Sequence, residues 1–100
     1  GVNKETLLKE GAVSESVVEE MVIGAMQLGK AEYGIAISGV AGPGGGSKER
    51  PVGTVCFALG SSEKIITSTM HFEGERDEVR NQSILYAFTE INNFLKTLQN

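Results

Sequence analysis

A hydroxyl and a glycine-rich segment stand between two apolar runs in the middle of the chain. Ser38 ends the apolar run at residues 35–37, and the segment that follows, residues 39–46, contains five glycines and Pro43. Consecutive backbone N–H groups in such a segment can form a nest that binds an anion, and glycine lets a ligand approach the main chain closely. A wide surface turn without a ligand is the alternative interpretation. For Ser38 the alternative is an ordinary turn residue at the end of a strand.

The other candidates for chemistry are two arginines, one histidine and one cysteine. Arg76 and Arg80 are four residues apart, which places them on one side of an expected C-terminal helix, where they could bind a phosphate or remain solvated charges. His71 has no serine, cysteine or carboxylate at a spacing typical of a triad, so we interpret it as a polar position on a strand. Cys56 lies in an apolar run and is interpreted as a buried small side chain. The spacing of potential ligands is not typical of a metal site.

The spacing within the glycine segment excludes three familiar motifs. It lacks the Gly-Lys-Ser/Thr of a Walker A loop. Gly42 and Gly44 begin a dinucleotide fingerprint, but Ser47 occupies the place of the third glycine and a strand is expected next. A serine-hydrolase elbow requires glycine at position 36, which is Ala36.

Hydrophobic periodicity predicts that these residues lie in an α/β domain of helices and three strands. The expected helices are residues 4–9, 14–28 and 77–98, and the expected strands are residues 33–38, 52–59 and 64–72. Ser14 is an expected N-cap of the second helix, and Ser16 with Glu19 is an alternative capping box. The first strand is apolar without clean alternation, which is typical of a central strand covered on both faces. The second and third strands are predicted to form an antiparallel hairpin.

The last expected helix, residues 77–98, is predicted to bury one apolar stripe of side chains. Its predicted buried stripe is Val79, Ile84, Ala87, Phe88, Ile91, Leu95 and Leu98. In the third strand, Ile66, Met70 and Phe72 are expected on one face, and Thr67, Thr69 and His71 on the other.

Length and charge limit the classes of function. One hundred residues predict a single domain spanning 1–100, and no run is long enough to be a membrane span. The formal charge of −4 argues against a nucleic-acid partner but allows a small phosphorylated ligand. A single cysteine fits a reducing cytoplasm.

Five segments together resemble one family, the C-terminal domain of the competence/damage-inducible protein CinA. They are GVNKETL at 1–7, GAVSE at 11–15, SGVAGPGGG at 38–46, RPVGTV at 50–55 and FEGERDEVR at 72–80. The resemblance covers essentially the whole chain and implies a three-layer α/β/α sandwich with a mixed sheet, forming a homodimer. It also implies hydrolysis of the carboxamide of nicotinamide mononucleotide to nicotinate mononucleotide and ammonia, without a metal or other cofactor.

The resemblance also implies roles for individual residues. The family's proposed nucleophile is a serine in S-C-T-G-G, assisted by a lysine in Y-S-N-x-x-K, and both motifs precede the segment at which this chain begins. The chain is therefore expected to be an N-terminally incomplete domain and to be inactive alone. Ser38 and Arg76 are the expected catalytic residues, supporting the reacting group and the substrate or its phosphate. The expected substrate-binding residues are Gly39, Ala41, Gly42, Pro43, Gly44, Gly45 and Arg80.

Two other functions remain open at this point. The chain could be a non-catalytic nucleotide-binding or regulatory domain that has kept the pocket without the chemistry. It could also be a structural dimerisation module.

Overall fold

The computed structural model describes residues 2–6, 13–39 and 52–98. A helical turn at residues 4–6 is followed by α2 (Glu15–Gly29), β1 (Tyr33–Gly39), β2 (Thr54–Ser61), β3 (Ile65–His71) and α3 (Arg76–Leu98). The predicted order and type of these elements are confirmed, with boundaries that differ by at most two residues. The predicted continuation of the first helix to residue 9 lies outside the described residues.

The three described strands form one antiparallel sheet in the order β1-β2-β3. The predicted hairpin of β2 and β3 is confirmed, and it turns between Ser61 and Lys64, whose backbones exchange hydrogen bonds of 2.9 and 3.2 Å. Gly60 begins the turn with φ +148°, and a Cβ there would lie 2.1 Å from the Lys64 carbonyl oxygen. The parallel pairing that a mixed sheet requires stays a prediction.

The central strand of the described sheet is β2, whereas the sequence pattern favoured β1 for that place. Residues 54–60 of β2 are all buried. In β1 the side chains of Ile35 and Ile37 are 37% and 40% exposed. The prediction that β1 is covered on both faces is therefore wrong for the described part of the chain, where β1 is an edge strand.

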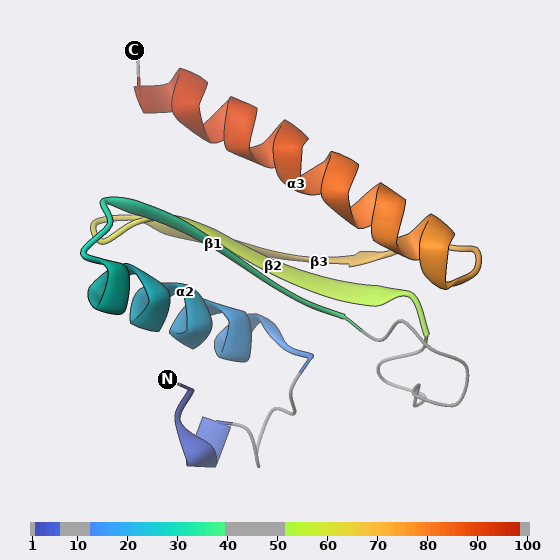
Figure 1. Cartoon of the computed structure of the whole chain (residues 1–100), viewed down its shortest axis with the longest axis horizontal. Helices are drawn as coiled ribbons and strands as arrows, with labels where there is room; N and C mark the ends of the chain where they lie inside the picture. Colours follow the sequence, from blue (N-terminus) through green and yellow to red (C-terminus); the bar gives the residue numbers. More distant parts are fainter. Residues whose placement is uncertain (1, 7–12, 40–51, 99–100) are drawn as a thin grey trace.

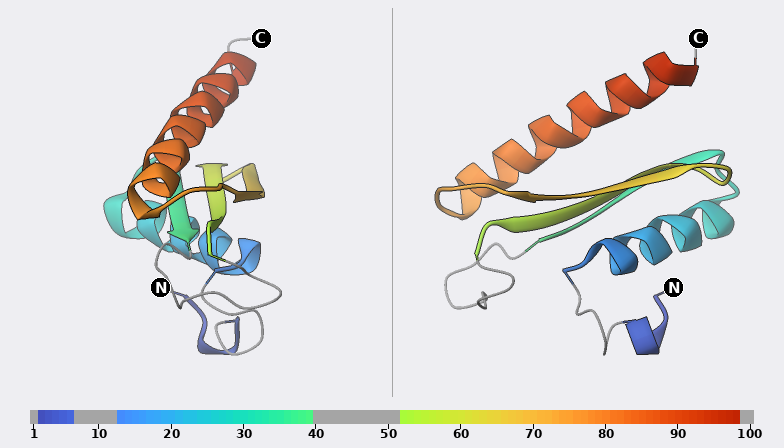
Figure 2. Two further views of the ribbon diagram at one scale, coloured as in Figure 1. Left: turned by 90° about the vertical axis from the view of Figure 1, so that its right-hand side faces the viewer. Right: turned by 180° about the vertical axis from the view of Figure 1, so that it is seen from behind.

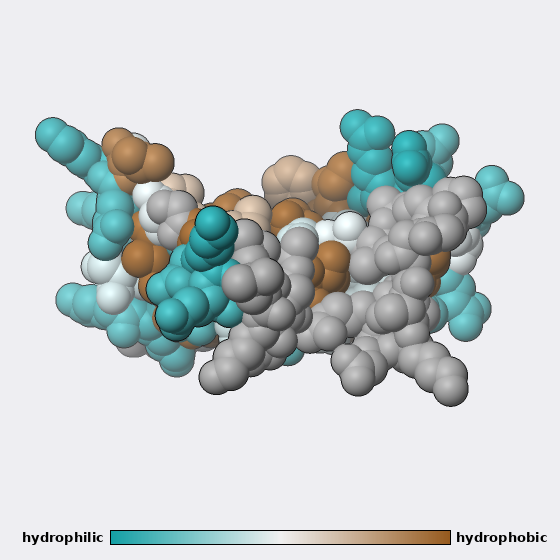
Figure 3. Space-filling model, turned by 90° about the horizontal axis from the view of Figure 1, so that it is seen from below, coloured by the Kyte–Doolittle hydropathy of each residue, from teal (hydrophilic) through white to brown (hydrophobic). Residues whose placement is uncertain are grey.

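The two long helices lie on opposite sides of the sheet (Figure 1, Figure 2). On one side, α2 packs its Val18, Val22 and Met26 against the sheet residues Ala36, Cys56 and Ala58. On the other side, α3 packs its Val79 and Ala87 against Val55 and Phe57 of β2. Cys56 is 2% exposed, which confirms that it is a buried small side chain. Seen from the side of α2, hydrophobic and hydrophilic surface are interspersed (Figure 3).

Helix α2 begins and ends where its capping residues predict. The Ser14 side chain accepts a hydrogen bond of 3.2 Å from the Val17 N–H, which confirms the predicted N-cap. Lys30 follows Gly29, the last residue of α2, with φ 51°, a left-handed conformation that ends the helix.

Helix α3 begins with a side-chain cap and buries a different stripe from the predicted one. The Glu75 N–H donates to the Glu78 carboxylate at 2.9 Å, as in a capping box. The buried residues of α3 are Val79, Ser83, Ala87 and Phe94. Of the predicted stripe, Ile84, Phe88 and Leu95 are exposed, and the side chain of Leu98 lies outside the described residues. The prediction considered only which residues are apolar. In the structure, α3 is oriented so that Ser83 and Phe94 face the sheet.

A carboxylate ties the start of α2 to β3. Glu15 accepts hydrogen bonds from the Thr67 hydroxyl at 2.8 Å and from the Thr69 hydroxyl at 2.6 Å. Both threonines lie on the face predicted for them, and Met70 and Phe72 pack on the opposite face toward α3. The hydrogen bonds from Thr69 and then Thr67 lower the pKa of Glu15, because they stabilise its charged form.

We expect Glu15→Gln to lower the free energy of unfolding at pH 7 by about 1 kcal/mol, since charge-assisted hydrogen bonds are replaced by weaker ones. A carboxylate whose pKa is lowered in the folded state contributes its stability above the unfolded pKa, about 4.3, and loses it as pH falls through the folded pKa. Urea unfolding should therefore show a difference between wild type and variant at pH 7 that becomes smaller as the pH falls below the unfolded pKa. Glu19→Gln, an exposed position one turn along α2, is the control. A wild type–variant difference that does not change with pH would contradict this account.

No helix in the described ranges is long and apolar enough to cross a membrane.

Candidate functional site

A hollow of about 340 Å³ lies between the end of β1 and the first turns of α3. It is lined by Ile37, Gly39, Val55, Arg76, Val79, Arg80, Ser83 and Ile84. Three of the residues predicted to bind or act on a substrate, Gly39, Arg76 and Arg80, therefore lie together. They come from segments almost forty residues apart in the chain.

The start of α3 makes this hollow suitable for an anion. Arg76 is the first residue of α3 and Arg80 is one turn later, so both side chains lie on the same face of the helix. The N-terminal end of a helix also carries a partial positive charge and free N–H groups. Asp77 and Glu78 are in the same turn but do not line the hollow. The arrangement can hold one phosphate or carboxylate against two guanidinium groups.

Ser38 belongs to the same strand end but faces the other side of the sheet. In the register of β1 with β2, Ser38 pairs with Cys56, whereas Ile37 pairs with Phe57 and Gly39 with Val55. Cys56 packs toward α2, and Val55 and Phe57 pack toward α3. Because side chains alternate along a strand, the Ser38 hydroxyl is on the α2 side, away from the arginines. The structure therefore does not bring Ser38 into the hollow.

The strand end nevertheless keeps Ser38 and the hollow close. Gly39 is the last residue of β1, one peptide unit beyond Ser38, or about 3.8 Å between Cα atoms. A Cβ added at Gly39 would lie 3.1 Å from Val55, so a larger residue would crowd the floor of the hollow. Of the glycine segment only Gly39 is described. The predicted binding residues Ala41, Gly42, Pro43, Gly44 and Gly45 lie outside the described residues.

The chain returns from the glycine segment against the end of β3. The Gly53 carbonyl accepts a hydrogen bond of 2.9 Å from the Phe72 N–H. Gly53 has φ +97°, and a Cβ there would lie 2.2 Å from the Phe72 carbonyl oxygen. His71 Nε2 lies 3.1 Å from the Val52 carbonyl oxygen, which can only accept, so Nε2 carries the proton. His71 thus anchors the re-entering chain, a role that the sequence did not predict.

Other residues of the hollow were also missed. Ser83 and Ile84 line it, although Ser83 was not singled out and Ile84 was expected in the core. Ser83 donates its hydroxyl to the Val79 carbonyl at 2.7 Å. Its position, seven residues after Arg76 and three after Arg80, is the helical spacing that could have indicated a shared face.

Within residues 2–6, 13–39 and 52–98, no group of three or more His, Cys, Asp and Glu side chains is placed to hold a metal ion.

Comparison with known proteins identifies the family of this chain. The model of the CinA C-terminal domain matches residues 1–95. The chain belongs to the CinA C-terminal domain family. It is 53% identical over 88 residues to the nicotinamide-nucleotide amidohydrolase PncC of Escherichia coli, covering 87% of this chain and 53% of that protein. It is 48% identical over 88 residues to a CinA-like protein of Fervidobacterium nodosum, covering 88% of this chain and 22% of that protein.

Solved structures agree with this membership. The competence damage-inducible protein A of Klebsiella pneumoniae superimposes with a TM-score of 0.89 at 39% identity, covering 95% of this chain and 59% of that chain. A CinA superfamily protein of Enterobacter cloacae superimposes with a TM-score of 0.85 at 41% identity, covering 91% of this chain and 54% of that chain. The α/β fold of the CinA domain is thus established for this chain, which spans about half the length of the amidohydrolase relative.

Proposed function

We propose that this chain supplies one half of the active site of a nicotinamide-nucleotide amidohydrolase. The observation that carries the proposal is the hollow where Gly39, Arg76 and Arg80 meet, in a chain 53% identical to such an enzyme. The substrate of that reaction, nicotinamide mononucleotide, carries a phosphate at one end and a carboxamide at the other. A pair of arginines at a helix start suits the phosphate end.

In this proposal the two faces of the β1 end hold different parts of the substrate. Arg76 and Arg80 bind the phosphate on the α3 side. Ser38, on the α2 side, forms a hydrogen bond to the reacting carboxamide. The segment with Ala41, Gly42, Pro43, Gly44 and Gly45 joins these two faces and contacts the nucleotide through its backbone.

The chemistry itself requires residues beyond this chain, whose sequence contains neither S-C-T-G-G nor Y-S-N-x-x-K. In the complete enzyme a lysine-activated serine attacks the carboxamide carbon, ammonia leaves, and water releases nicotinate mononucleotide from the serine. N–H or hydroxyl donors stabilise the oxyanion, each worth roughly 3 kcal/mol in other hydrolases. No cofactor takes part.

The remaining features of the proposal concern the whole assembly. Residues 1–100 belong to one domain, a three-layer α/β/α sandwich with a mixed sheet. It works as a homodimer in the cytoplasm, with a small nucleotide as its ligand rather than a nucleic acid or a membrane.

The test uses a chimera in which this chain replaces the matching part of the Escherichia coli relative. We expect the chimera to release ammonia from nicotinamide mononucleotide and the 100-residue chain alone to release none. Release by the chain alone would show that the absent serine and lysine are not required. A folded chimera that neither binds nor hydrolyses nicotinamide mononucleotide would contradict the proposed substrate.

Ser38→Ala in the chimera should lower kcat about 100- to 1000-fold, because one donor near the developing oxyanion is lost. Ser38→Thr keeps the hydroxyl and adds only a methyl group, so it should retain most of the activity. Circular dichroism should show that both variants are folded. Unchanged turnover in Ser38→Ala would show that Ser38 is not part of the active site.

The alternative function is a non-catalytic, nucleotide-binding or regulatory domain. Binding of nicotinamide mononucleotide by a chimera that releases no ammonia would support this alternative.

A further inference from the structure

One polar side chain lies within the buried stripe of α3. The stripe consists of Val79, Ser83, Ala87 and Phe94, and Ser83 is 8% exposed. Alanine in its place would be as small, would favour the helix more and would bury no polar group. A buried hydroxyl needs a hydrogen-bond partner, and here the partner is the Val79 carbonyl oxygen at 2.7 Å.

The hydrogen bond from Ser83 to Val79 is one that the helix can give up. In an α-helix the carbonyl of Val79 also accepts a hydrogen bond from the backbone N–H of Ser83, four residues later. The carbonyl therefore keeps a partner when the hydroxyl turns away from it. Rotation about one side-chain bond is enough to redirect the hydroxyl, so Ser83 can donate to a ligand instead.

Ser83 lines the same hollow as two cations. It lies three residues after Arg80 and seven after Arg76, so the three side chains share one face of α3 over about 10 Å of helix. Among the described residues that line this hollow, none is acidic. Its apolar wall includes Val55 and Val79, which are 3% and 2% exposed. A hydroxyl beside two guanidinium groups, against an apolar wall, favours an anion.

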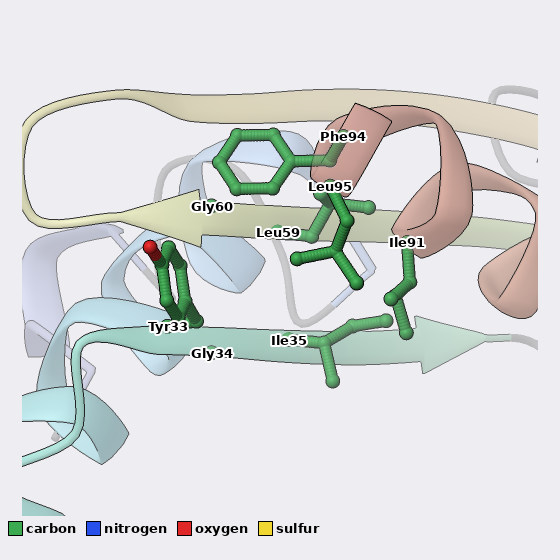
Figure 4. Close-up of a pocket in the computed structure, with 8 residues that line it drawn as sticks. All are labelled: Tyr33, Gly34, Ile35, Leu59, Gly60, Ile91, Phe94 and Leu95. Carbon is green, nitrogen blue, oxygen red and sulfur yellow. The ribbon is translucent and has the colours of Figure 1, made fainter. Parts of the chain in front are cut away.

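A second hollow on the α3 side of the sheet lacks these features. It has a volume of about 230 Å³ and lies between the start of β1 and the C-terminal half of α3. Figure 4 shows its apolar side chains, among them Ile35, Leu59 and Phe94. None of the described residues that line it is charged. An anion is therefore expected in the hollow that contains Ser83 and not in this one.

We propose that the Ser83 hydroxyl is a third ligand of the substrate phosphate, beside the guanidinium groups of Arg76 and Arg80. This rests on the function proposed above, in which the phosphate of nicotinamide mononucleotide occupies the hollow. A phosphate group on a nucleotide has three terminal oxygens, all of them strong acceptors. Three donors on one helix face can therefore bind one oxygen each.

The test uses the chimera of this chain and the Escherichia coli relative, with the serine of its S-C-T-G-G motif changed to alanine to prevent turnover. Binding of nicotinamide mononucleotide is measured by calorimetry, and the phosphorus-31 resonance of the bound nucleotide is recorded at saturation. We expect Ser83→Ala to raise Kd about tenfold and to shift this resonance. Tenfold is near the lower end for a hydrogen bond to a charged group, because the hydroxyl gives up its bond to Val79.

Thr89→Ala is the matched control. The Thr89 hydroxyl makes the same kind of bond along α3, donating to the Leu85 carbonyl at 2.9 Å, but Thr89 is exposed and does not line the hollow. We expect this variant to change neither Kd nor the resonance. If Ser83→Ala binds like wild type while Arg76→Ala weakens binding, the role of Ser83 is overturned and the proposed function stands. A raised Kd with an unchanged resonance would also overturn it, since Ser83 would then act only through the shape of the helix.

Failure of the proposed function gives a different result. A chimera with its S-C-T-G-G serine intact that binds the nucleotide through Ser83 but releases no ammonia would contradict the enzyme function and support this inference. A folded chimera that does not bind nicotinamide mononucleotide would overturn both.

Discussion

Arg76→Ala in the chimera is expected to lower kcat/KM for nicotinamide mononucleotide about 10- to 150-fold. A hydrogen bond to a charged group is worth about 1.5–3 kcal/mol, and Arg76 lines the hollow beside Arg80. If it holds the phosphate, far from the scissile amide, most of the loss should be a higher KM. Arg76→Lys should recover part of the affinity, since lysine keeps the charge and loses the bidentate geometry.

Lys96→Ala is the control for this experiment. Lys96 is an exposed cation of the same helix, in its last turn, and its removal should leave steady-state kinetics unchanged. A fall in kcat with KM unchanged in Arg76→Ala would indicate that Arg76 acts on the reacting group and not on the phosphate. Unchanged kinetics would exclude both roles.

Phe57→Ala is expected to destabilise the chain by about 3–5 kcal/mol, the usual cost of removing a buried phenylalanine. Phe57 is 1% exposed at the centre of the sheet. Its ring lies 4.6 Å from that of Tyr86 and 6.4 Å from that of Phe72, between centroids. Since small domains have only about 5–15 kcal/mol in total, thermal unfolding followed by circular dichroism should shift steeply or disappear.

Phe88→Ala removes the same side chain from a position of α3 that is 63% exposed. In the isolated chain it should change the free energy of unfolding by no more than about 0.5 kcal/mol. Similar losses in the two variants would mean that the face of α3 toward the sheet is wrongly assigned.

Local signals in the sequence predicted most of the fold. Ser14 marked the start of α2, and alternation in β3 separated Thr67 and Thr69 from Met70. These features depend on residues within a few positions of one another, so a single sequence carries them. The CinA resemblance, confirmed by the match to residues 1–95, supplied the fold class.

The rotation of α3 and the place of β1 could not be predicted in this way. Apolar residues fill two adjacent stripes of α3, and only packing on the sheet decides that Ser83 is buried and Phe88 exposed. The same holds for β1, whose apolar pattern describes a strand with two neighbours whereas the described sheet provides one.

The candidate site was predicted in part. The four-residue spacing of Arg76 and Arg80 indicated a shared face, and the structure adds Gly39 to it. That Ser38 faces the opposite side depends on the register of β1 with β2, which no local pattern specifies.

The most direct test of the central claim is a crystal structure of the chimera with nicotinamide mononucleotide, with the serine of its S-C-T-G-G motif changed to alanine to prevent turnover. We predict that the phosphate lies within hydrogen-bond distance of the guanidinium groups of Arg76 and Arg80, and that the carboxamide lies beyond Gly39 toward Ser38. A nucleotide bound elsewhere, with these arginines in solvent, would contradict the account.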